Sequence, residues 1–471
     1  MGQVVITKLE FLGQPQKVLA RLCDRAAASL LESASLMPGL SGWSYIACDP
    51  VLTLKTRGNQ TVLLENNNIL ESWENPFRAL ETVFERFKPQ SVRAKRDTEL
   101  STAIRPDGMG FAGGWLGFLG YDLVRFLEEI PNTAIKLEQP DLRLHLMDFV
   151  LAFDHANQTW YSSQTELRGF ENRVEIWSEI LELAKHGAAS QGEFKSGKLE
   201  ALTKQEVYLE QVERCLEYIR AGDIFQVNLT HRLEAAFIGD PFALYRALML
   251  SNPAPFAAFL SGENLTIVSA SPERFLKRTG RKLEARPIKG TRARGATPQE
   301  DQAQKMVLET SEKDRSENLM IVDLMRNDLG RVAEFGSVKT SELFNLEPHG
   351  AVWQMVSTIT AQLKTGLSSV DVLKATFPPG SMTGAPKIRA MQIIEELEPV
   401  RRGVYSGVIG YFDLNGDFDL SVVIRSAIIS NGNIQLQSGG AIVADSISEL
   451  ELDETHAKTR ALRTVLQKGN P

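Results

Sequence analysis

The sequence predicts a mixed α/β protein built from two segments, and three observations support this prediction. Short β-rich runs alternate with helical runs along the whole chain. Between about residues 186 and 202 the composition shifts toward Gly, Ala, Ser, Lys and Gln, as in a surface linker. The chain has 471 residues, of which 43% are hydrophobic and 24% charged, and this suffices for a large core. We therefore expect an N-terminal domain over residues 1–190 and a second domain over residues 203–465.

The N-terminal segment is expected to form a sheet covered by helices. Its pattern predicts strands at 60–64 and 149–153 and a helix at 76–87. The glycine-rich stretch at 113–122 lacks the spacing of a dinucleotide-binding loop. Its glycines are therefore expected to permit close packing of strands.

The second segment begins with a predicted helix. Thr203 and Glu206 have the spacing of a capping box, and Gly222 marks the expected end of the helix. Further along, strands are predicted at 266–269, 418–429 and 434–437, and helices at 298–312, 317–329 and 387–398.

Charge and cysteine content exclude several classes of protein. The net charge of -7 and pI near 5.6 argue against nucleic-acid binding, which needs a basic surface. Cys23, Cys48 and Cys215 have no paired spacing, which argues against a disulfide framework and favours a reducing cytoplasm. No apolar stretch reaches the roughly 18 residues of a membrane-spanning helix, and no secretion or lipidation signal opens the chain. A soluble cytoplasmic protein is therefore expected, acting on a small metabolite or a protein partner.

Two pairs of carboxylates have helical spacing. Asp314 and Glu317 follow Ser311 on a predicted helix, where Glu317 would point along an apolar face. Glu451 and Glu454 lie on a predicted C-terminal helix. Each pair has a structural alternative: Glu317 could cap the first turn of its helix, Glu449 could close a capping box with Ser446, and Glu454 could pair with Lys458 four residues on. One carboxylate from each helix would equally suffice for Mg²⁺, which takes oxygen ligands together with water and substrate.

Two small-residue segments offer backbone N–H groups to an anion. One spans residues 377–387, includes Thr383 and feeds a predicted helix. The other is Ser438-Gly439-Gly440-Ala441, which follows a predicted strand. A tight turn is the alternative interpretation of either segment.

Four further side chains are suited to chemistry or binding. Lys289 has several cations near it in sequence, which together with burial would lower its pKa and free an amine to attack carbon; a solvated basic loop is the alternative. Glu273 is either a general acid or the partner of Arg274. Arg425, in a predicted strand, is either a clamp for a carboxylate or a surface residue, and Tyr411 is expected at the end of another strand.

Five strings in the second segment together resemble the chorismate-utilising enzymes, which include anthranilate synthase component I, aminodeoxychorismate synthase component I and the isochorismate and salicylate synthases. The strings are 271–275 (SPERF), 287–292 (PIKGTR), 314–324 (DRSENLMIVDL), 384–387 (GAPK) and 440–446 (GAIVADS). The resemblance is dense from about residue 205 to 460 and weaker before it. It implies an α/β sandwich of two β-sheets with surrounding helices and a site in a cleft of the second domain.

Carried over position by position, the resemblance implies Mg²⁺ as cofactor and chorismate as substrate. Glu317 and Glu454 would hold the metal, with Asp314 and Glu451 behind them, and Glu273 would protonate the departing C4 hydroxyl. The positions implied to bind or line the substrate are Gln226, Gly290, Thr291, Thr383, Tyr411, Arg425, Gly439, Gly440 and Ala441.

Two positions select a branch of the family. Isochorismate and salicylate synthases carry a water-activating Lys where this chain has Gln226, which argues against a water nucleophile. Anthranilate synthases usually have Ala at the position of Lys289, whereas aminodeoxychorismate synthases have Lys, and that amine is thought to add to C2 as the C4 oxygen leaves. Ammonia then enters at C4 and expels the Lys. The resemblance thus implies 4-amino-4-deoxychorismate as product, for 4-aminobenzoate and folate synthesis.

Gln354 is a departure from the pattern, because many relatives have a His there that is associated with pyruvate elimination in anthranilate synthases. This argues further against anthranilate as product. None of the three cysteines lies in a Gly-x-Cys-x-Gly elbow, so we expect ammonia to come from a separate glutamine amidotransferase subunit.

Two alternatives remain open. The chain could be anthranilate synthase component I, which converts chorismate to anthranilate and pyruvate for tryptophan synthesis. It could also be a tryptophan-binding regulatory or structural subunit, because Ser33, Pro255 and Phe256 lie in strings that resemble the tryptophan pocket of anthranilate synthases.

Overall fold

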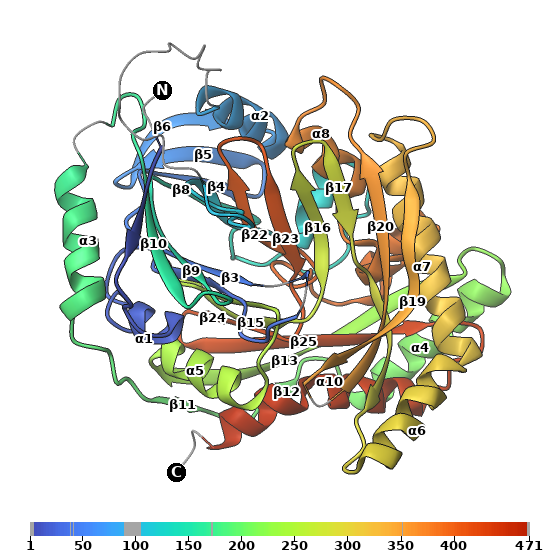
Figure 1. The fold of residues 1–471 in the computed structure, drawn as a ribbon. Coiled ribbons are helices and arrows are strands. Elements are labelled where there is room, and N and C mark those ends of the chain that lie inside the picture. Colours follow the sequence, from blue (N-terminus) through green and yellow to red (C-terminus); the bar gives the residue numbers. More distant parts are fainter. Residues whose placement is uncertain are drawn as a thin grey trace.

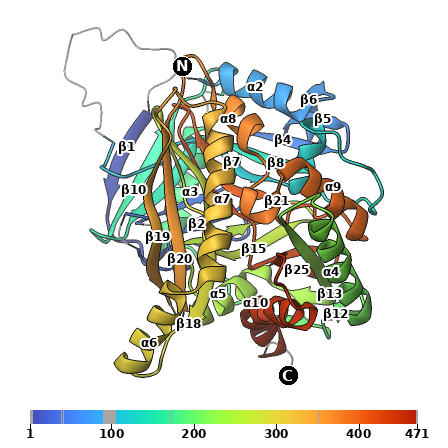
Figure 2. The same cartoon turned by 90° about the vertical axis from the view of Figure 1, so that its right-hand side faces the viewer.

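The computed structural model describes residues 4–37, 39–40, 42–88, 105–170, 173–350 and 352–468. Within these ranges the chain forms two large antiparallel sheets that pack face to face, with helices on the outer faces (Figures 1 and 2). The expected sandwich of two sheets with surrounding helices is confirmed.

The first sheet has its longest pairing between β13 and β25, which runs over ten residue pairs. In spatial order its strands are β1 (Val4–Leu9), β10 (Thr159–Thr165), β9 (Phe149–Asp154), β3 (Trp43–Ala47), β2 (Ser29–Glu32), β14 (Phe256–Leu260), β15 (Thr266–Ser271), β24 (Ser426–Ser430), β25 (Asn433–Ile442), β13 (Gln226–Gly239) and β11 (Phe194–Ser196), with β12 (Glu200–Ala201) and β21 (Gly384–Ala385) also paired to β13.

The second sheet ends at β18, the strand that carries Lys289. In spatial order its strands are β18 (Ile288–Ala293), β20 (Val352–Gln362), β17 (Lys282–Ala285), β16 (Arg274–Thr279), β23 (Phe418–Val422), β22 (Val408–Asp413), β7 (Gly114–Leu119), β8 (Leu142–Met147), β4 (Leu52–Arg57), β5 (Gln60–Glu65) and β6 (Asn68–Trp73), with β19 (Lys339–His349) paired to β20.

Both sheets take strands from either side of the predicted domain boundary. β2 pairs with β14 in the first sheet, and β7 pairs with β22 in the second. The two segments therefore share both sheets, and the division at residues 190–203 stays a prediction about the organisation of the sequence.

Helices cover the two outer faces. Those packed on the first sheet include α1 (Pro15–Leu19), α3 (Val174–His186), α5 (Pro241–Ser251) and α10 (Ser448–Lys468). Those packed on the second include α2 (Pro76–Arg86), α7 (Glu312–Gly330) and α8 (Ser369–Thr376). The remaining helices are α4 (Gln205–Arg220) and α9 (Lys387–Leu397) beside β13, α6 (Pro298–Glu309) beside β18, and the 3-10 turns at Tyr121–Phe126 and Gly380–Met382. None of the described helices combines the length and the apolar character needed to cross a membrane.

The space between the sheets is filled by apolar side chains from both. Phe118 and Ile409 of the second sheet and Val150 and Ile267 of the first belong to one buried cluster. Burial of this apolar surface is what holds the two sheets against each other.

Most predicted elements are present, but one is split and one is shorter than predicted. The predicted strand at 418–429 divides into β23 and β24, because Arg425 between them has a φ of 53°. The predicted helix at 298–312 ends at Glu309, and α7 starts at Glu312 with Ser311 as its N-cap. The capping box predicted for Thr203 and Glu206 is wrong, since Lys204 is the N-cap of α4 and no side chain caps it.

The glycine-rich stretch at 113–122 forms β7 and confirms the expected close packing. A Cβ at Gly114 would collide with the carbonyl oxygen of Phe412, and a Cβ at Gly117 with that of Arg143. These glycines let β7 lie between β22 and β8.

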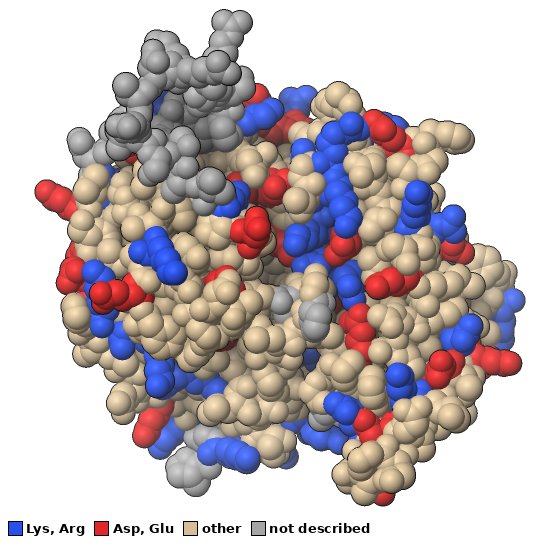
Figure 3. Space-filling view, in the orientation of Figure 1, with Lys and Arg blue, Asp and Glu red and all other residues tan. Residues whose placement is uncertain are grey.

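Lys and Arg side chains gather in a column over β16 and β17 (Figure 3). Several have acidic partners: Lys282 lies 3.6 Å from Glu284, and Arg281 contacts Glu334. The column is therefore partly balanced by local carboxylates.

Candidate active site

A cavity of about 510 Å³ brings together residues that lie far apart in the sequence, and its size is typical of a site for a small molecule. Its walls are parts of β18, β20, β25, α7 and α10 with the segments that precede β16 and β24. Glu273, Lys289, Glu317, Arg425 and Glu454 all line it, as the sequence predicted.

Lys289 is partly buried in this cavity, and its ammonium group donates to the backbone oxygen of Ser381 over 3.4 Å. Burial lowers the pKa of Lys289; the negative charge of Glu317 opposes this shift and the positive charge of Lys458 adds to it. The lowered pKa and burial as its main cause agree with the prediction from the sequence, but the cation that adds to the shift is Lys458, which is distant in sequence. Arg292, one of the cations near Lys289 in sequence, forms an ion pair with Asp314 at 3.0 Å.

Glu273 is 5% exposed, and burial raises its pKa from 4.5 to about 7, against the opposing effects of Ser381 and Lys289. It is not the partner of Arg274. The Arg274 guanidinium instead pairs with Asp419 and Glu284, at 2.9 Å each. A carboxyl group that is protonated near neutral pH and lies close to an amine can act as a general acid.

The carboxylates Asp314 and Glu317 lie near the N-terminus of α7, which is capped. Ser311 accepts a hydrogen bond from the backbone N–H of Asp314, so the first turn of α7 is capped by Ser311 and not by Glu317. Burial raises the pKa of Glu317, and the charges of Lys289 and Lys313 oppose that shift. Glu317 is thus a largely buried carboxylate that faces two cations.

Of the two carboxylates of α10, Glu454 lines the same cavity and Glu451 lies buried beside it, against Gly440. Burial acts to raise the pKa of Glu454, but the charge and hydrogen bond of Lys458, 2.7 Å away, together with the charges of Lys289 and Lys313, lower it overall. Glu451 is 3% exposed and accepts a hydrogen bond of 2.7 Å from Ser446. The capping box predicted for Ser446 and Glu449 is wrong, because α10 starts only at Ser448.

The oxygen donors of α7 and α10 fit Mg²⁺, although within the described residues no group of three His, Cys, Asp or Glu is already arranged around a metal position. The Oε2 atom of Glu451 is buried and has no hydrogen-bond partner. A Cβ added at Gly440 would lie 2.8 Å from this atom, so only Gly leaves it room. An unpartnered buried carboxylate oxygen is costly unless a ligand or ion satisfies it.

Five of the positions predicted to contact substrate line the cavity: Gly290, Thr291, Arg425, Gly439 and Ala441. Arg425 is held in its position between β23 and β24, where burial lowers its pKa. The sequence had suggested that Gly439 and Ala441 follow a strand. In the structure both lie within β25.

Four other predicted positions do not line the cavity. Tyr411 lies in β22 and belongs to a different pocket, whereas Tyr405, six residues earlier, lines the cavity. Gly440 is on the opposite side of β25 from its neighbours, against Glu451. Thr383 is fully buried and its hydroxyl donates to the backbone of Gly380.

Gln226, the fourth of these positions, is completely buried, and neither polar atom of its side chain has a partner. Asn228, two residues on, lines the cavity with an unpartnered Nδ2, and so does Gln354 with an unpartnered Oε1. Sequence reasoning missed Asn228. Its signal was the alternation of β13, which places it on the same face as Gln226.

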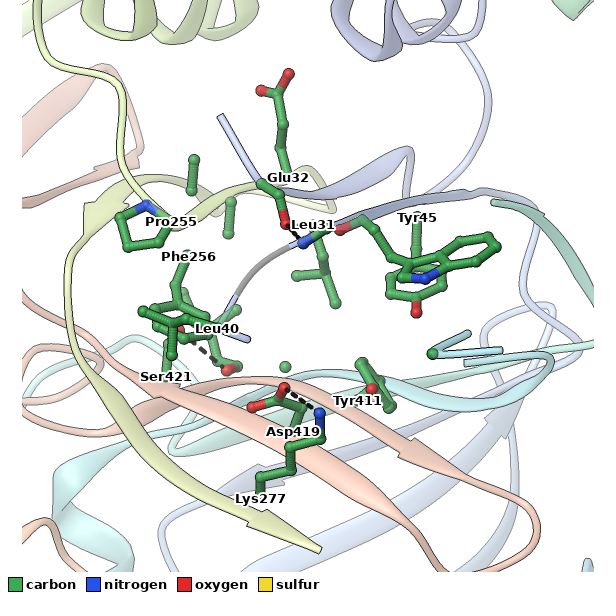
Figure 4. A pocket seen from close by; sticks show the side chains of 18 residues that line it. Leu31, Glu32, Leu40, Tyr45, Pro255, Phe256, Lys277, Tyr411, Asp419 and Ser421 are labelled. Atoms are coloured by element: carbon green, nitrogen blue, oxygen red, sulfur yellow. Dashed lines mark hydrogen bonds and ion pairs between the residues drawn. The ribbon is translucent and has the colours of Figure 1, made fainter. Parts of the chain in front are cut away.

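A second, smaller pocket of about 100 Å³ lies between the sheets (Figure 4). Ser33, Pro255 and Phe256 all line it, so the three positions predicted for a tryptophan pocket do come together. Tyr411 and Asp419 form the opposite wall in Figure 4. Tryptophan binding itself stays a prediction.

Comparison with known proteins finds similarity to chorismate binding enzymes of two named kinds. The sequence pattern of chorismate binding enzymes matches residues 40–464. Aminodeoxychorismate synthase component 1 of Escherichia coli is 39% identical over 469 residues, covering 99% of both chains. Anthranilate synthase component 1 of Thermus thermophilus is 41% identical over 460 residues, covering 97% of this chain and 96% of the other. The crystal structure of anthranilate synthase component I from Streptococcus pneumoniae has a TM-score of 0.76 at 29% identity, and the match covers 91% of this chain and 93% of that one.

Proposed function

The chain belongs to the family of chorismate binding enzymes, and we propose that it aminates chorismate at C4 to give 4-amino-4-deoxychorismate. Relatives named for this activity and for anthranilate synthesis are about equally similar to it, so overall identity does not separate the two. The observation that carries the proposal is Lys289, whose amine lies in the cavity with a lowered pKa beside a protonated Glu273.

In the first step the neutral Lys289 amine attacks C2 of chorismate. Its lone pair forms the C2–N bond, the two ring double bonds move from C1=C2 and C5=C6 to C1=C6 and C4=C5, and the C4–O bond breaks. The electron pair leaves with the oxygen, which takes the proton of Glu273 and departs as water. The raised pKa of Glu273 supports this role, because the group still carries its proton at pH values where an ordinary Glu has lost it.

In the second step ammonia attacks C4 and the two ring double bonds move back to C1=C2 and C5=C6. The C2–N bond then breaks, its electron pair returns to Lys289, and the proton lost by the entering ammonia restores the acid. Two displacements that each shift the double bond place the amino group at C4.

Arg425 and the backbone of Gly439 and Ala441 are suited to hold carboxylates of the substrate, since Arg binds a carboxylate through two parallel hydrogen bonds. Glu317 and Glu454, with Asp314 and Glu451 beside them, are the residues that would hold Mg²⁺. When bound, Mg²⁺ would neutralise the ring carboxylate and the charge that develops as the C4 oxygen leaves.

Ammonia is proposed to come from a glutamine amidotransferase subunit. The relatives are called component 1, which implies a second component. Among the described residues, burial raises the pKa of each cysteine, so none has the character of an activated thiolate. We place this activity in 4-aminobenzoate and folate synthesis, in the cytoplasm.

Anthranilate synthesis is the second candidate, favoured by the 41% identity with the Thermus thermophilus enzyme. Lys289 and Gln354 argue against it, because the residues at these two positions differ from those usual in that branch. A tryptophan-binding subunit without activity is disfavoured by the cavity, which is lined by the amine of Lys289, the acid Glu273 and three further carboxylates suited to catalysis.

Product identification tests the proposal. The purified chain would be incubated with chorismate, Mg²⁺ and ammonium at alkaline pH, and the products separated by chromatography. We expect 4-amino-4-deoxychorismate, converted to 4-aminobenzoate when the lyase is added, and no product from glutamine alone. Anthranilate with pyruvate would establish the second candidate instead.

A further inference from the structure

The carboxylates at the facing ends of α7 and α10 are nearly all paired with basic side chains of the chain itself. Asp314 pairs with Arg292 at 3.0 Å, and Glu454 pairs with Lys458 at 2.7 Å. Arg292 comes from β18 and Lys458 from α10, and each forms an ion pair with one of these carboxylates. They leave Glu317 on α7, which the charge of Lys289 also faces, and Glu451 on α10 to a further cation between the helices.

Lys313 occupies that place. Its ammonium nitrogen lies 3.6 Å from Oε1 of Glu451 and 3.9 Å from Oε1 of Glu317, so it links the two helices. It also lines the cavity, and its charge favours the ionised form of Glu454. A single cation is thus shared among carboxylates that come from separate helices.

The position of Lys313 within α7 makes its role more specific. The residue lies two positions after the N-cap Ser311, in the first turn, where the helix dipole disfavours a positive charge. Its side chain is 51% exposed, so no apolar packing fixes it there. The attraction of the carboxylates is what holds the ammonium group between the helices, and a stronger cation can displace it.

We propose that the Lys313 ammonium, which lies against Glu317 and Glu451, fills the space beside Glu317 that Mg²⁺ held by Glu317 and Glu454 takes in the working enzyme, and that metal binding requires it to swing out. This inference rests on the proposed function, because it assumes that these carboxylates hold Mg²⁺. The chain then keeps its metal site charge-balanced before the metal arrives. Lys313 acts as a built-in competitor that weakens Mg²⁺ binding and prevents repulsion between α7 and α10 in the metal-free protein.

Calorimetric titration of the full chain with MgCl₂ tests this, for wild type, Lys313→Met and Lys313→Arg, with Lys339→Met as a control on an exposed lysine of β19. Loss of two half-exposed ion pairs corresponds to about a fivefold change in an equilibrium constant. We expect Lys313→Met to bind Mg²⁺ about fivefold more tightly than wild type, and Lys313→Arg and the control to bind as wild type does. Without Mg²⁺ the Met variant should melt at a lower temperature than wild type, and Mg²⁺ should raise its melting temperature by more.

Equal or weaker Mg²⁺ binding by Lys313→Met would overturn this inference alone. Absence of Mg²⁺ binding in every variant would overturn it together with the metal assignment of the proposed function. A Met variant that binds Mg²⁺ as wild type does but binds chorismate more weakly would show that Lys313 contacts substrate instead.

Discussion

Replacing Glu273 by Gln is expected to stabilise the protein above pH 7 while changing its stability little at pH 5. Folding raises the pKa of Glu273 from 4.5 to about 7 because the carboxyl group is buried. A raised pKa favours the folded state below pH 4.5, and this contribution is lost as the pH rises through about 7. At pH 8 the wild-type protein therefore carries a buried charge whose cost a neutral Gln avoids.

The shift sets the size of the effect. A displacement from 4.5 to about 7 corresponds to about 3 kcal/mol at pH 8 and to less than about 1 kcal/mol at pH 5. For a chain of this length, with an unfolding entropy of roughly 2 cal/mol/K per residue, that equals a gain of about 3 °C in melting temperature at pH 8.

Melting curves of wild type, Glu273→Gln and the exposed control Glu449→Gln, recorded from pH 5 to pH 8 without Mg²⁺, measure this difference directly. The gap between wild type and Glu273→Gln should widen with pH, and the control should show no such trend. A gap that stays constant with pH would refute the claim that Glu273 is buried as a protonated acid.

Three further substitutions probe the scaffold of the site. Arg402→Met should destabilise the protein by about 3–5 kcal/mol, because Arg402 pairs with the buried Glu398 at 2.7 Å and its removal would leave Glu398 unpaired. Urea unfolding measures this change in the free energy of unfolding. If Arg402→Met loses no more stability than the double variant Arg402→Met with Glu398→Gln, the unpaired Glu398 is not the cause. Gly440→Ala should weaken Mg²⁺ binding, because the added Cβ lies 2.8 Å from Oε2 of Glu451; unchanged calorimetric affinity would show that Glu451 takes no part in binding the metal. Gln354→Leu should raise the melting temperature slightly, since it removes a buried unpartnered acceptor worth about 1–3 kcal/mol, yet should raise the KM for chorismate; an unchanged KM would place Gln354 away from the substrate.

The fold was predictable as far as local patterns reach. Alternation and capping signals located elements such as β5, β9, α2 and α7. They carry no information about which distant strands pair, as when β2 meets β14 across more than 200 residues of sequence. Such pairings follow from burial of whole sheet faces, and no local pattern predicts them.

The site was predictable where a motif and a periodicity coincide. Glu317 and Glu454 were found because helical spacing and the family strings agree on them. Tyr411 was wrongly placed because two tyrosines lie six residues apart and only the structure shows that Tyr405 faces the cavity. Lys313 was missed because its importance depends on α10, which lies more than 130 residues away in sequence.

The mass of the peptide that contains Lys289 is the most direct test of the covalent step at this residue. The chain would be incubated with chorismate and Mg²⁺ but without ammonia, then denatured and digested. If Lys289 adds to chorismate, this peptide gains the mass of chorismate less one water. The corresponding peptide of Lys289→Ala shows no gain, and added ammonium removes the adduct from the wild-type peptide. Formation of 4-amino-4-deoxychorismate by Lys289→Ala at the wild-type rate, with no modified peptide in either protein, would contradict the account.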